Sequence, residues 1–161
     1  AGGDAELYDL YLAQLEGLAA RPDEYYRFFS ALPSFSDPAL VQRTLAFAVS
    51  PAVRTQDAPT LIAGLLARPA SRDATWRFVQ AEWPTLTQTL GTFQVIPTII
   101  GAPGTFCSTE AAGHVAEFFR TNPVPSADRT LRQAVERIDN CAALVARQSP
   151  ALTSWLTATA R

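Results

Sequence analysis

Apolar positions recur every three or four residues along most of this chain, a spacing that predicts amphipathic helices. The clearest pattern is a hairpin over residues 108–141, in which Ser108 is a suitable N-cap for the first arm and Ser126 for the second. The first arm should end near Thr121, because Pro123 follows. Two helices joined by so short a turn must lie antiparallel. Their expected apolar faces are Ala111, Val115, Phe118 and Phe119 on the first arm, and Leu131, Ala134, Val135, Ile138, Ala142 and Val145 on the second.

Proline and N-cap residues divide the remainder of the chain into further short helices. The segment from Thr92 to Ile100 is ambiguous, because β-branched residues suit a strand, but their spacing is helical and Pro97 excludes a central strand. We interpret it as a helix. Ser149-Pro150 predicts the start of a separate last helix that buries Leu152, Trp155 and Leu156. A first helix is expected with Leu7, Tyr11, Leu15 and Leu18 as its core face. Further helices should start after Arg21-Pro22, after the cap Ser36-Asp37-Pro38 and after the cap Gln56-Asp57. Another should run from Ser71 or Asp73 through Trp83, where Pro84 breaks it before a short helix to Leu90.

The pattern predicts about ten helices and no convincing strand, so the expected fold class is all-α. Helix starts near Pro22 and Ala58, and near Pro38 and Arg72, are about 35 residues apart. This distance resembles the period of paired-helix solenoids. We therefore expect a single domain over residues 1–161, built of antiparallel helix pairs stacked in a right-handed, HEAT/armadillo-like superhelical array.

The composition fits one folded domain, since 48% of the 161 residues are hydrophobic and 17% are charged. The net charge is −2 and every basic residue other than the one histidine is arginine. With this charge balance the chain has no cluster of positive charge that would bind nucleic acid or an anionic membrane, so neither is expected as a partner. The sequence shows no membrane-spanning run and no targeting peptide.

Signatures of catalysis are mostly missing. One histidine, His114, cannot make a His-Glu-x-x-His zinc site, and neither a phosphate-binding loop nor a Gly-x-Ser-x-Gly motif occurs. Cys107 and His114 are close enough in sequence to be considered as the nucleophile and base of a small hydrolase, although a histidine on the polar side of a helix is the simpler interpretation. Trp76 and Trp83 are expected in the core. We predict no catalytic, cofactor-binding or metal-binding residue in this chain.

Several short motifs occur in an order that resembles a known family. They include Arg54-Thr55-Gln56-Asp57, Trp76-x-Phe78, Trp83-Pro84, Phe118-Phe119, the run from Arg129 to Ile138, and Trp155-Leu156. Together they resemble the C-terminal helical domain of aminopeptidase N-type zinc peptidases, also called the endoplasmic reticulum aminopeptidase-like C-terminal domain. One departure follows Asn140, where many members carry Trp and this chain has Cys141-Ala142-Ala143-Leu144.

The resemblance implies a non-catalytic piece of a larger, bacterial peptidase. In that family the zinc ligands and the catalytic glutamate lie in an earlier domain, so zinc is expected there and no cofactor is expected here. The helical domain would cover the catalytic domain of the same parent chain and shape the chamber that holds the peptide substrate. The alternative is a free-standing α-solenoid that binds a protein partner in its concave groove.

The two cysteines lie symmetrically about the turn of the hairpin. Cys107 and Cys141 are each seventeen residues from Val124, so they come level in an antiparallel pair. Facing helix axes are about 8–10 Å apart, but Cys107 lies just outside its helix and can move inward. We expect the two residues to be neighbours, either as a disulfide or as two reduced, buried thiols. The compartment is left open between cytoplasmic and exported, and a disulfide would favour export.

Overall fold

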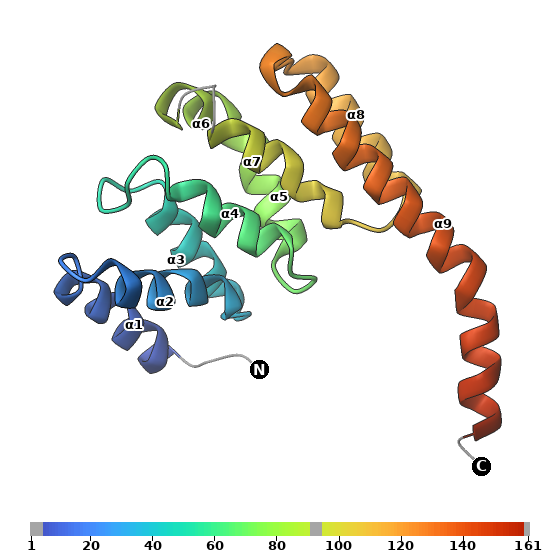
Figure 1. Cartoon of the computed structure of the whole chain (residues 1–161), viewed down its shortest axis with the longest axis horizontal. Coiled ribbons are helices and arrows are strands. Elements are labelled where there is room, and N and C mark those ends of the chain that lie inside the picture. The colour runs from blue at the N-terminus through green and yellow to red at the C-terminus, as the bar shows by residue number, and fades with distance from the viewer. Residues whose placement is uncertain (1–4, 91–94, 160–161) are drawn as a thin grey trace.

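The computed structural model describes residues 5–90 and 95–159. Every regular element in these two ranges is helical, which confirms the all-α fold class. Figure 1 shows the helices following one another roughly in chain order, from α1 at one end to α9 at the other. The elements are α1 (Ala5–Gly17), α2 (Pro22–Ala31), η1 (Leu32–Ser34), α3 (Pro38–Ala48), α4 (Ala58–Leu66), α5 (Arg72–Ala81), α6 (Trp83–Leu90), α7 (Val95–Gly101), η2 (Ala102–Thr105), α8 (Thr109–Thr121), η3 (Pro125–Ala127) and α9 (Asp128–Thr159).

Helices that are neighbours in the sequence pack against each other, α1 with α2, α3 with α4, α5 with α6, and α8 with α9. Helix α4 also contacts α2, α5 and α7, so it connects these pairs. Gly64 permits its close approach to η1, because a Cβ at this position would lie 2.9 Å from Cγ of Pro33. The large aliphatic residues of α4 are fully buried: Leu61, Ile62, Leu65 and Leu66. The pairing agrees with the predicted building unit, whereas a HEAT-like superhelix stays a prediction.

The predicted N-caps Asp37 and Ser108 are confirmed, whereas Ser126 is not a cap. Asp37 accepts hydrogen bonds from the backbone N–H groups of Ala39 and Leu40 at 2.8 and 3.3 Å. Ser108 accepts one from the N–H of Ala111 at 3.1 Å. Ser126 caps nothing, because Pro125 starts the 3₁₀ turn η3 that contains it and α9 begins only at Asp128. Short polar side chains at helix starts are thus informative, unless a proline forms its own turn first.

The helices around Trp83 and Pro97 also test the predicted boundaries. Trp83 begins α6 instead of ending α5, and Pro84 occupies the second position of α6, where a missing N–H costs no helical hydrogen bond. The ambiguous segment is helical from Val95 to Gly101, as predicted. Its expected start at Thr92 lies outside the described residues.

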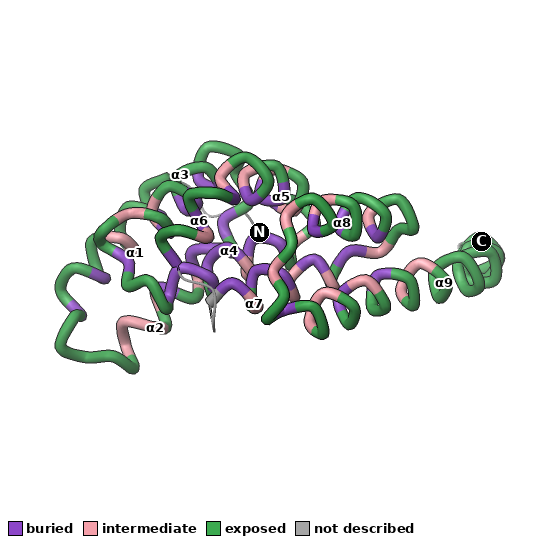
Figure 2. Tube along the Cα trace, turned by 90° about the horizontal axis from the view of Figure 1, so that it is seen from above, coloured by how far each residue is buried: buried purple, intermediate pink, exposed green. Residues whose placement is uncertain are grey.

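The predicted separate last helix is wrong. Helix α9 continues from Asp128 to Thr159 with Pro150 inside it. A proline within a helix removes one hydrogen bond and tends to bend the helix, and here it does not end it. Leu152, Trp155 and Leu156 are 51–61% exposed instead of buried, because no other described helix reaches this part of α9 (Figure 2).

Helix α1 and the turn after it direct the expected face toward the core at Tyr11, Leu15 and Leu18, and the prediction is wrong only for Leu7. Tyr8 is fully buried, whereas Leu7 is 39% exposed. The Tyr8 hydroxyl lies 3.0 Å from Oγ1 of Thr44, which itself donates to the carbonyl of Leu40, so Tyr8 is the donor. The guanidinium of Arg43 lies 4.7 Å from the centre of the tyrosine ring. Tyr8, whose hydroxyl has a buried partner on α3, therefore lies in the core where the apolar spacing predicted Leu7.

We expect the stability of the domain to fall in alkaline solution, partly through Tyr8. Burial raises the pKa of Tyr8 above its ordinary value of 10.0. The folded state then holds this proton more tightly than the unfolded chain. The stabilisation is fully present below about pH 10 and is lost as the pH rises through the folded pKa. Urea unfolding between about pH 9 and 11 should show a shallower decline for Tyr8→Phe than for the unchanged protein. Equal slopes would contradict this role of Tyr8.

Candidate functional site

Cys107 and Cys141 lie together at the point where α9 leaves the body of the molecule. The structure joins them in a disulfide with Cα atoms 5.0 Å apart, and both residues are half-buried. Cys107 lies between η2 and α8, and Cys141 lies in α9, so the link ties the two arms of the hairpin. That the protein carries this bond in solution stays a prediction, tested below.

A second contact fixes the same part of α9. The guanidinium of Arg137 donates to the carbonyl oxygen of Gly101 at 3.1 Å. The guanidinium also lies over Gly104, where a Cβ would come within 2.6 Å of Nε of Arg137. The glycine thus leaves the space that this arginine occupies. The base of α9 is therefore held to α7 and η2 as well as to α8.

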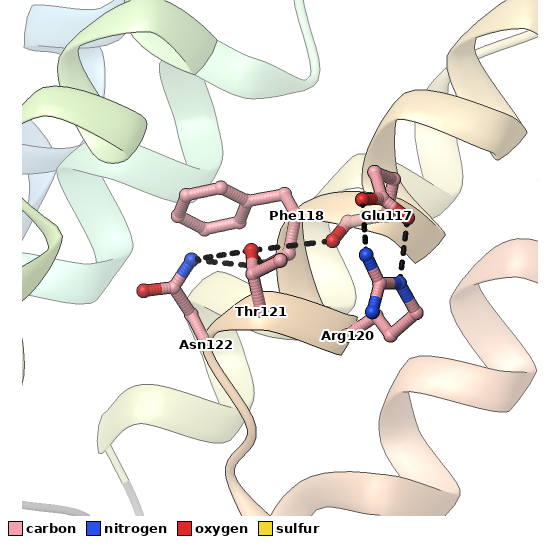
Figure 3. Close-up of polar contacts among 5 residues, drawn as sticks. All are labelled: Glu117, Phe118, Arg120, Thr121 and Asn122. Carbon is pink, nitrogen blue, oxygen red and sulfur yellow. Dashed lines mark hydrogen bonds and ion pairs between the residues drawn. The ribbon is translucent and has the colours of Figure 1, made fainter.

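Hydrogen bonds close the end of α8 next to the turn of the hairpin (Figure 3). The side-chain amide of Asn122 donates to the Phe118 carbonyl at 2.9 Å and to Oγ1 of Thr121 at 3.1 Å. Arg120 pairs with Glu117 through two contacts of 2.6 and 2.8 Å. This hydrogen-bonded partner lowers the pKa of the Glu117 carboxyl. The Asn122 amide thus helps to satisfy the carbonyl of Phe118, one of the last four of α8 that have no partner within the helix.

The two tryptophans lie in the core, as expected. Trp76 is 9% exposed and Trp83 is 5% exposed. Both pack edge-on against Phe118, at ring-centre distances of 5.4 and 5.7 Å, and Phe119 lies 5.2 Å from Trp83. The rings therefore join α5 and α6 to α8, and they are not available as an exposed stacking platform.

A groove of about 600 Å³ lies beside these rings, between α5 and α8. Trp76 and Phe118 line it together with the polar residues Asp73, Arg77 and His114. Among the described residues these three polar side chains make no hydrogen bond or ion pair with one another or with the rest of the chain. His114 is exposed, as expected. A neighbouring hollow shares His114 with the groove and is lined by Cys107. The sulfur of Cys107 is bonded to Cys141, so Cys107 offers no thiolate to His114. This arrangement suits binding and not nucleophilic catalysis.

A second recess, of about 420 Å³, lies between the α3–α4 loop and α6. Apolar side chains such as Val53 and Leu86 line most of it, with the hydroxyls of Thr85 and Thr89 at its border. Its size is that of small ligand sites. Arg54 is its charged lining residue.

The loop beside this recess is fixed by a polar network that the sequence interpretation missed. Asp57 was expected as a helix cap, but its carboxylate makes no cap hydrogen bond. It accepts from the Tyr26 hydroxyl at 3.0 and 3.1 Å and from Nε of Arg54 at 3.0 Å, and Arg54 also donates to the Tyr26 hydroxyl at 2.6 Å. Partial desolvation and the neighbouring carboxylate raise the pKa of Tyr26. An arginine three residues before the aspartate was the signal in the sequence, but the tyrosine on α2 could not be paired with it from spacing alone.

Asp57→Ala is expected to destabilise the domain by about 1–3 kcal/mol, because it removes the acceptor of charge-assisted hydrogen bonds from Tyr26 and Arg54. Asp57 is only 8% exposed, so water cannot fully replace the carboxylate. Urea unfolding measures the change. Asp73→Ala is the matched control, since Asp73 is an exposed aspartate in the α5–α8 groove. Equal effects of the two substitutions would show that the network is not stabilising.

The described residues contain neither a cluster of metal-ligating side chains nor a helix that could span a membrane. Residues 5–90 and 95–159 contain no group of three His, Cys, Asp or Glu side chains placed to hold a metal. No helix within this part of the chain has the length and hydrophobicity of a membrane span. The α5–α8 groove, the recess beside α6, the aromatic cluster and the linked hairpin are the features of the described residues that bear on function.

Several known proteins are similar to this chain, and each of them is much longer than it. It is 37% identical over 116 residues to aminopeptidase M1 of Arabidopsis thaliana, which covers 71% of this chain and 13% of that protein. It is 28% identical over 139 residues to aminopeptidase M1-C of Oryza sativa subsp. japonica, with 86% and 15% covered. Mitochondrial aminopeptidase 2 of Saccharomyces cerevisiae is 26% identical over 157 residues, with 96% and 16% covered. This chain thus spans about one seventh of the length of these relatives.

The relatives come from plants and a yeast, so they give no support to the bacterial source that we expected. The sequence profile that matches the chain is that of the ERAP1-like C-terminal domain, and the match extends over residues 1–140. It includes all the predicted motifs except the Trp155-Leu156 pair in the exposed part of α9. The chain belongs to the ERAP1-like C-terminal domain family.

Proposed function

We propose that this chain is a non-catalytic domain of a zinc-dependent aminopeptidase. The family match over residues 1–140 carries the proposal, together with relatives that are all called aminopeptidases. The domain would cover the catalytic domain of the same parent chain and shape the chamber that holds the peptide. In this account the zinc ion belongs to the catalytic domain, which would supply the hydrolytic chemistry.

The residues described above support a role in binding and shaping. The groove between α5 and α8 and the recess beside α6 are concave surfaces on which a peptide or the catalytic domain can rest. Their positions are set by the aromatic cluster and by the Tyr26–Arg54–Asp57 network, so their shape is largely fixed before any partner binds. Such preorganised walls lower the entropic cost of holding a substrate.

The reading frame of the gene distinguishes this proposal from a free-standing α-solenoid that binds another protein. A His-Glu-x-x-His motif encoded upstream in the same frame supports the peptidase. An independent start codon close to Ala1 would support the solenoid module.

A direct test compares the parent enzyme with a version that lacks residues 1–161. The intact parent should release amino acids from short peptides and should not attack the N-terminus of a folded protein. The shortened version, if it keeps its zinc and its fold, should lose this discrimination, because part of the chamber wall is gone. Circular dichroism and zinc content serve as the controls. Unchanged discrimination in a folded, zinc-loaded shortened enzyme would contradict the proposal.

A further inference from the structure

The Cys107–Cys141 bond lies at the outer end of the contact between α8 and α9. The first buried residue of α8 is Ala112 and the last buried residue of α9 is Ile138, so core packing ends about one helical turn before the bond. Past Cys141, Ala142 is half-buried and residues 143–159 are exposed. The bond therefore holds the start of α8 to α9 where core packing no longer does.

Cys107 also lines a hollow of about 400 Å³ between the start of α5 and the start of α8. The hollow shares Asp73, Trp76 and His114 with the larger α5–α8 groove, so the two are neighbours. A volume of this size accommodates a small ligand. A small molecule can therefore approach Cys107 while the protein stays folded.

This access bears on the reactivity of the bond. Disulfides that a thiol can reach are the labile ones, whereas a disulfide enclosed in a core is reduced only when the protein unfolds. Asp73 and Glu110 at the border of the hollow repel a thiolate, but both are exposed, so solvent and salt screen them. Arg72 and the N-terminus of α8, which begins two residues after Cys107, attract negative charge.

We propose that the Cys107–Cys141 bond is a redox latch, which a small thiol entering the hollow opens in the folded protein. The thiolate attacks Sγ of Cys107, the bond to Cys141 breaks, and the sulfur of Cys141 leaves with the electron pair and takes a proton from water. A second small thiol then attacks the mixed disulfide at Cys107. This step releases Cys107 as a thiol, and the two small thiols leave joined as their own disulfide.

Opening the latch changes the shape of the hollow. Residues between 106 and 111 form part of its wall, and in the reduced protein no covalent bond ties them to α9. Val115 and Phe119 remain buried further along α8, so the change is confined to the start of this helix. The redox state thus sets the width of one end of the α5–α8 groove. This inference goes beyond the proposed function and concerns this chain alone, whatever its parent does.

Reduction of the folded protein at increasing urea concentration distinguishes a latch from a structural disulfide. The unchanged chain is incubated with excess glutathione below the urea concentrations that unfold it, and free thiols are counted after an acid quench. The rate should stay the same within about 2-fold, because entry into the hollow exposes little new surface. A rate that rises steeply from the lowest urea concentration would show that unfolding must come first, and it would overturn the proposal.

Two variants of α8 test the route of attack. His114→Trp narrows the hollow and should slow reduction by glutathione several-fold. Ala116→Trp places the same ring at an equally exposed position that faces a different recess, and it should leave the rate unchanged. Alkylation after brief exposure should find glutathione on Cys107 and the alkyl group on Cys141. Equal rates in the two variants, or glutathione on Cys141, would rule out attack through the hollow.

Hydrogen exchange tests what the latch controls. After reduction, the backbone amides of residues 106–112 should exchange about 10-fold or more faster, and those of residues 115–121 should change little. The double substitution Cys107→Ala and Cys141→Ala should reproduce the reduced pattern and should not respond to added thiol. Oxidised glutathione should restore slow exchange in the reduced, unchanged chain. Equal exchange in the oxidised and reduced proteins would show that the bond holds nothing in place, and the latch would be refuted.

Discussion

Replacing Phe119 by alanine is expected to lower the free energy of unfolding by about 3–5 kcal/mol, the usual cost of removing a buried aromatic side chain. Phe119 is 3% exposed and lies 5.2 Å from Trp83 and 5.0 Å from Phe118, measured between ring centres. Its ring joins α8 to α5 and α6, and these short helices cannot close the cavity without moving Trp76 as well. Urea unfolding followed by tryptophan fluorescence measures both the stability and the repacking of the cluster.

Leu156→Ala is the control for this loss. It also removes a large apolar side chain, but Leu156 is 51% exposed on the projecting part of α9. Its effect on the isolated chain should stay within about 0.5 kcal/mol, as for most surface positions. A similar loss for both substitutions would mean that the aromatic cluster is not the core that the structure describes.

Removal of the Cys107–Cys141 bond is expected to lower the stability by about 3–4 kcal/mol on the chain-entropy model of a cross-link. The two residues are 34 positions apart, so the bond closes a sizeable loop in the unfolded chain. The double substitution Cys107→Ala and Cys141→Ala can be compared with the unreduced protein by urea unfolding. A variant with only one cysteine replaced is a less clean comparison, because it leaves a reactive thiol.

Thiol titration establishes first whether the bond exists in solution. Air-exposed protein, denatured without a reductant, should show no free thiol, and treatment with dithiothreitol should release two. Two free thiols before reduction would mean that the cysteines are ordinary half-buried residues. The compartment of the parent would then stay open, because the disulfide is the feature of this chain that would favour export.

Local patterns predicted most of the helices, because a helix is specified by its own apolar spacing and by its ends. Asp37 and Ser108 illustrate this point: each is a polar residue directly before an apolar pattern, and each caps its helix. The neighbourhood of Cys107 and Cys141 was also predictable, since a hairpin brings residues that are equidistant from its turn to the same level.

Features that depend on distant residues were not predictable in this way. Tyr8 replaces Leu7 in the core because Thr44, 36 residues later, offers its hydroxyl a partner. Asp57 binds Tyr26, 31 residues earlier, instead of capping α4. Pro150 was interpreted as a helix start, but a proline can also continue a helix when the turn before it keeps its other hydrogen bonds.

The chemistry of individual residues said little about function, because the recesses contain no nucleophile with an adjacent base. The order and spacing of weak motifs such as Arg54-Thr55-Gln56-Asp57 and Trp83-Pro84 identified the family instead. In the structure these residues hold the α3–α4 loop and the aromatic core. In this chain these residues therefore serve packing, and they give no information about contacts with a peptide.

The central claim, that this chain is a non-catalytic domain of a zinc aminopeptidase, is tested most directly by measuring zinc content and hydrolysis of aminoacyl anilides for the purified parent and for residues 1–161 alone. The account predicts that the parent holds stoichiometric zinc and hydrolyses the substrate in a manner abolished by a chelator, whereas the isolated chain is folded, free of zinc and inactive. Hydrolysis by the isolated chain, or a zinc-free parent without aminopeptidase activity, would contradict it.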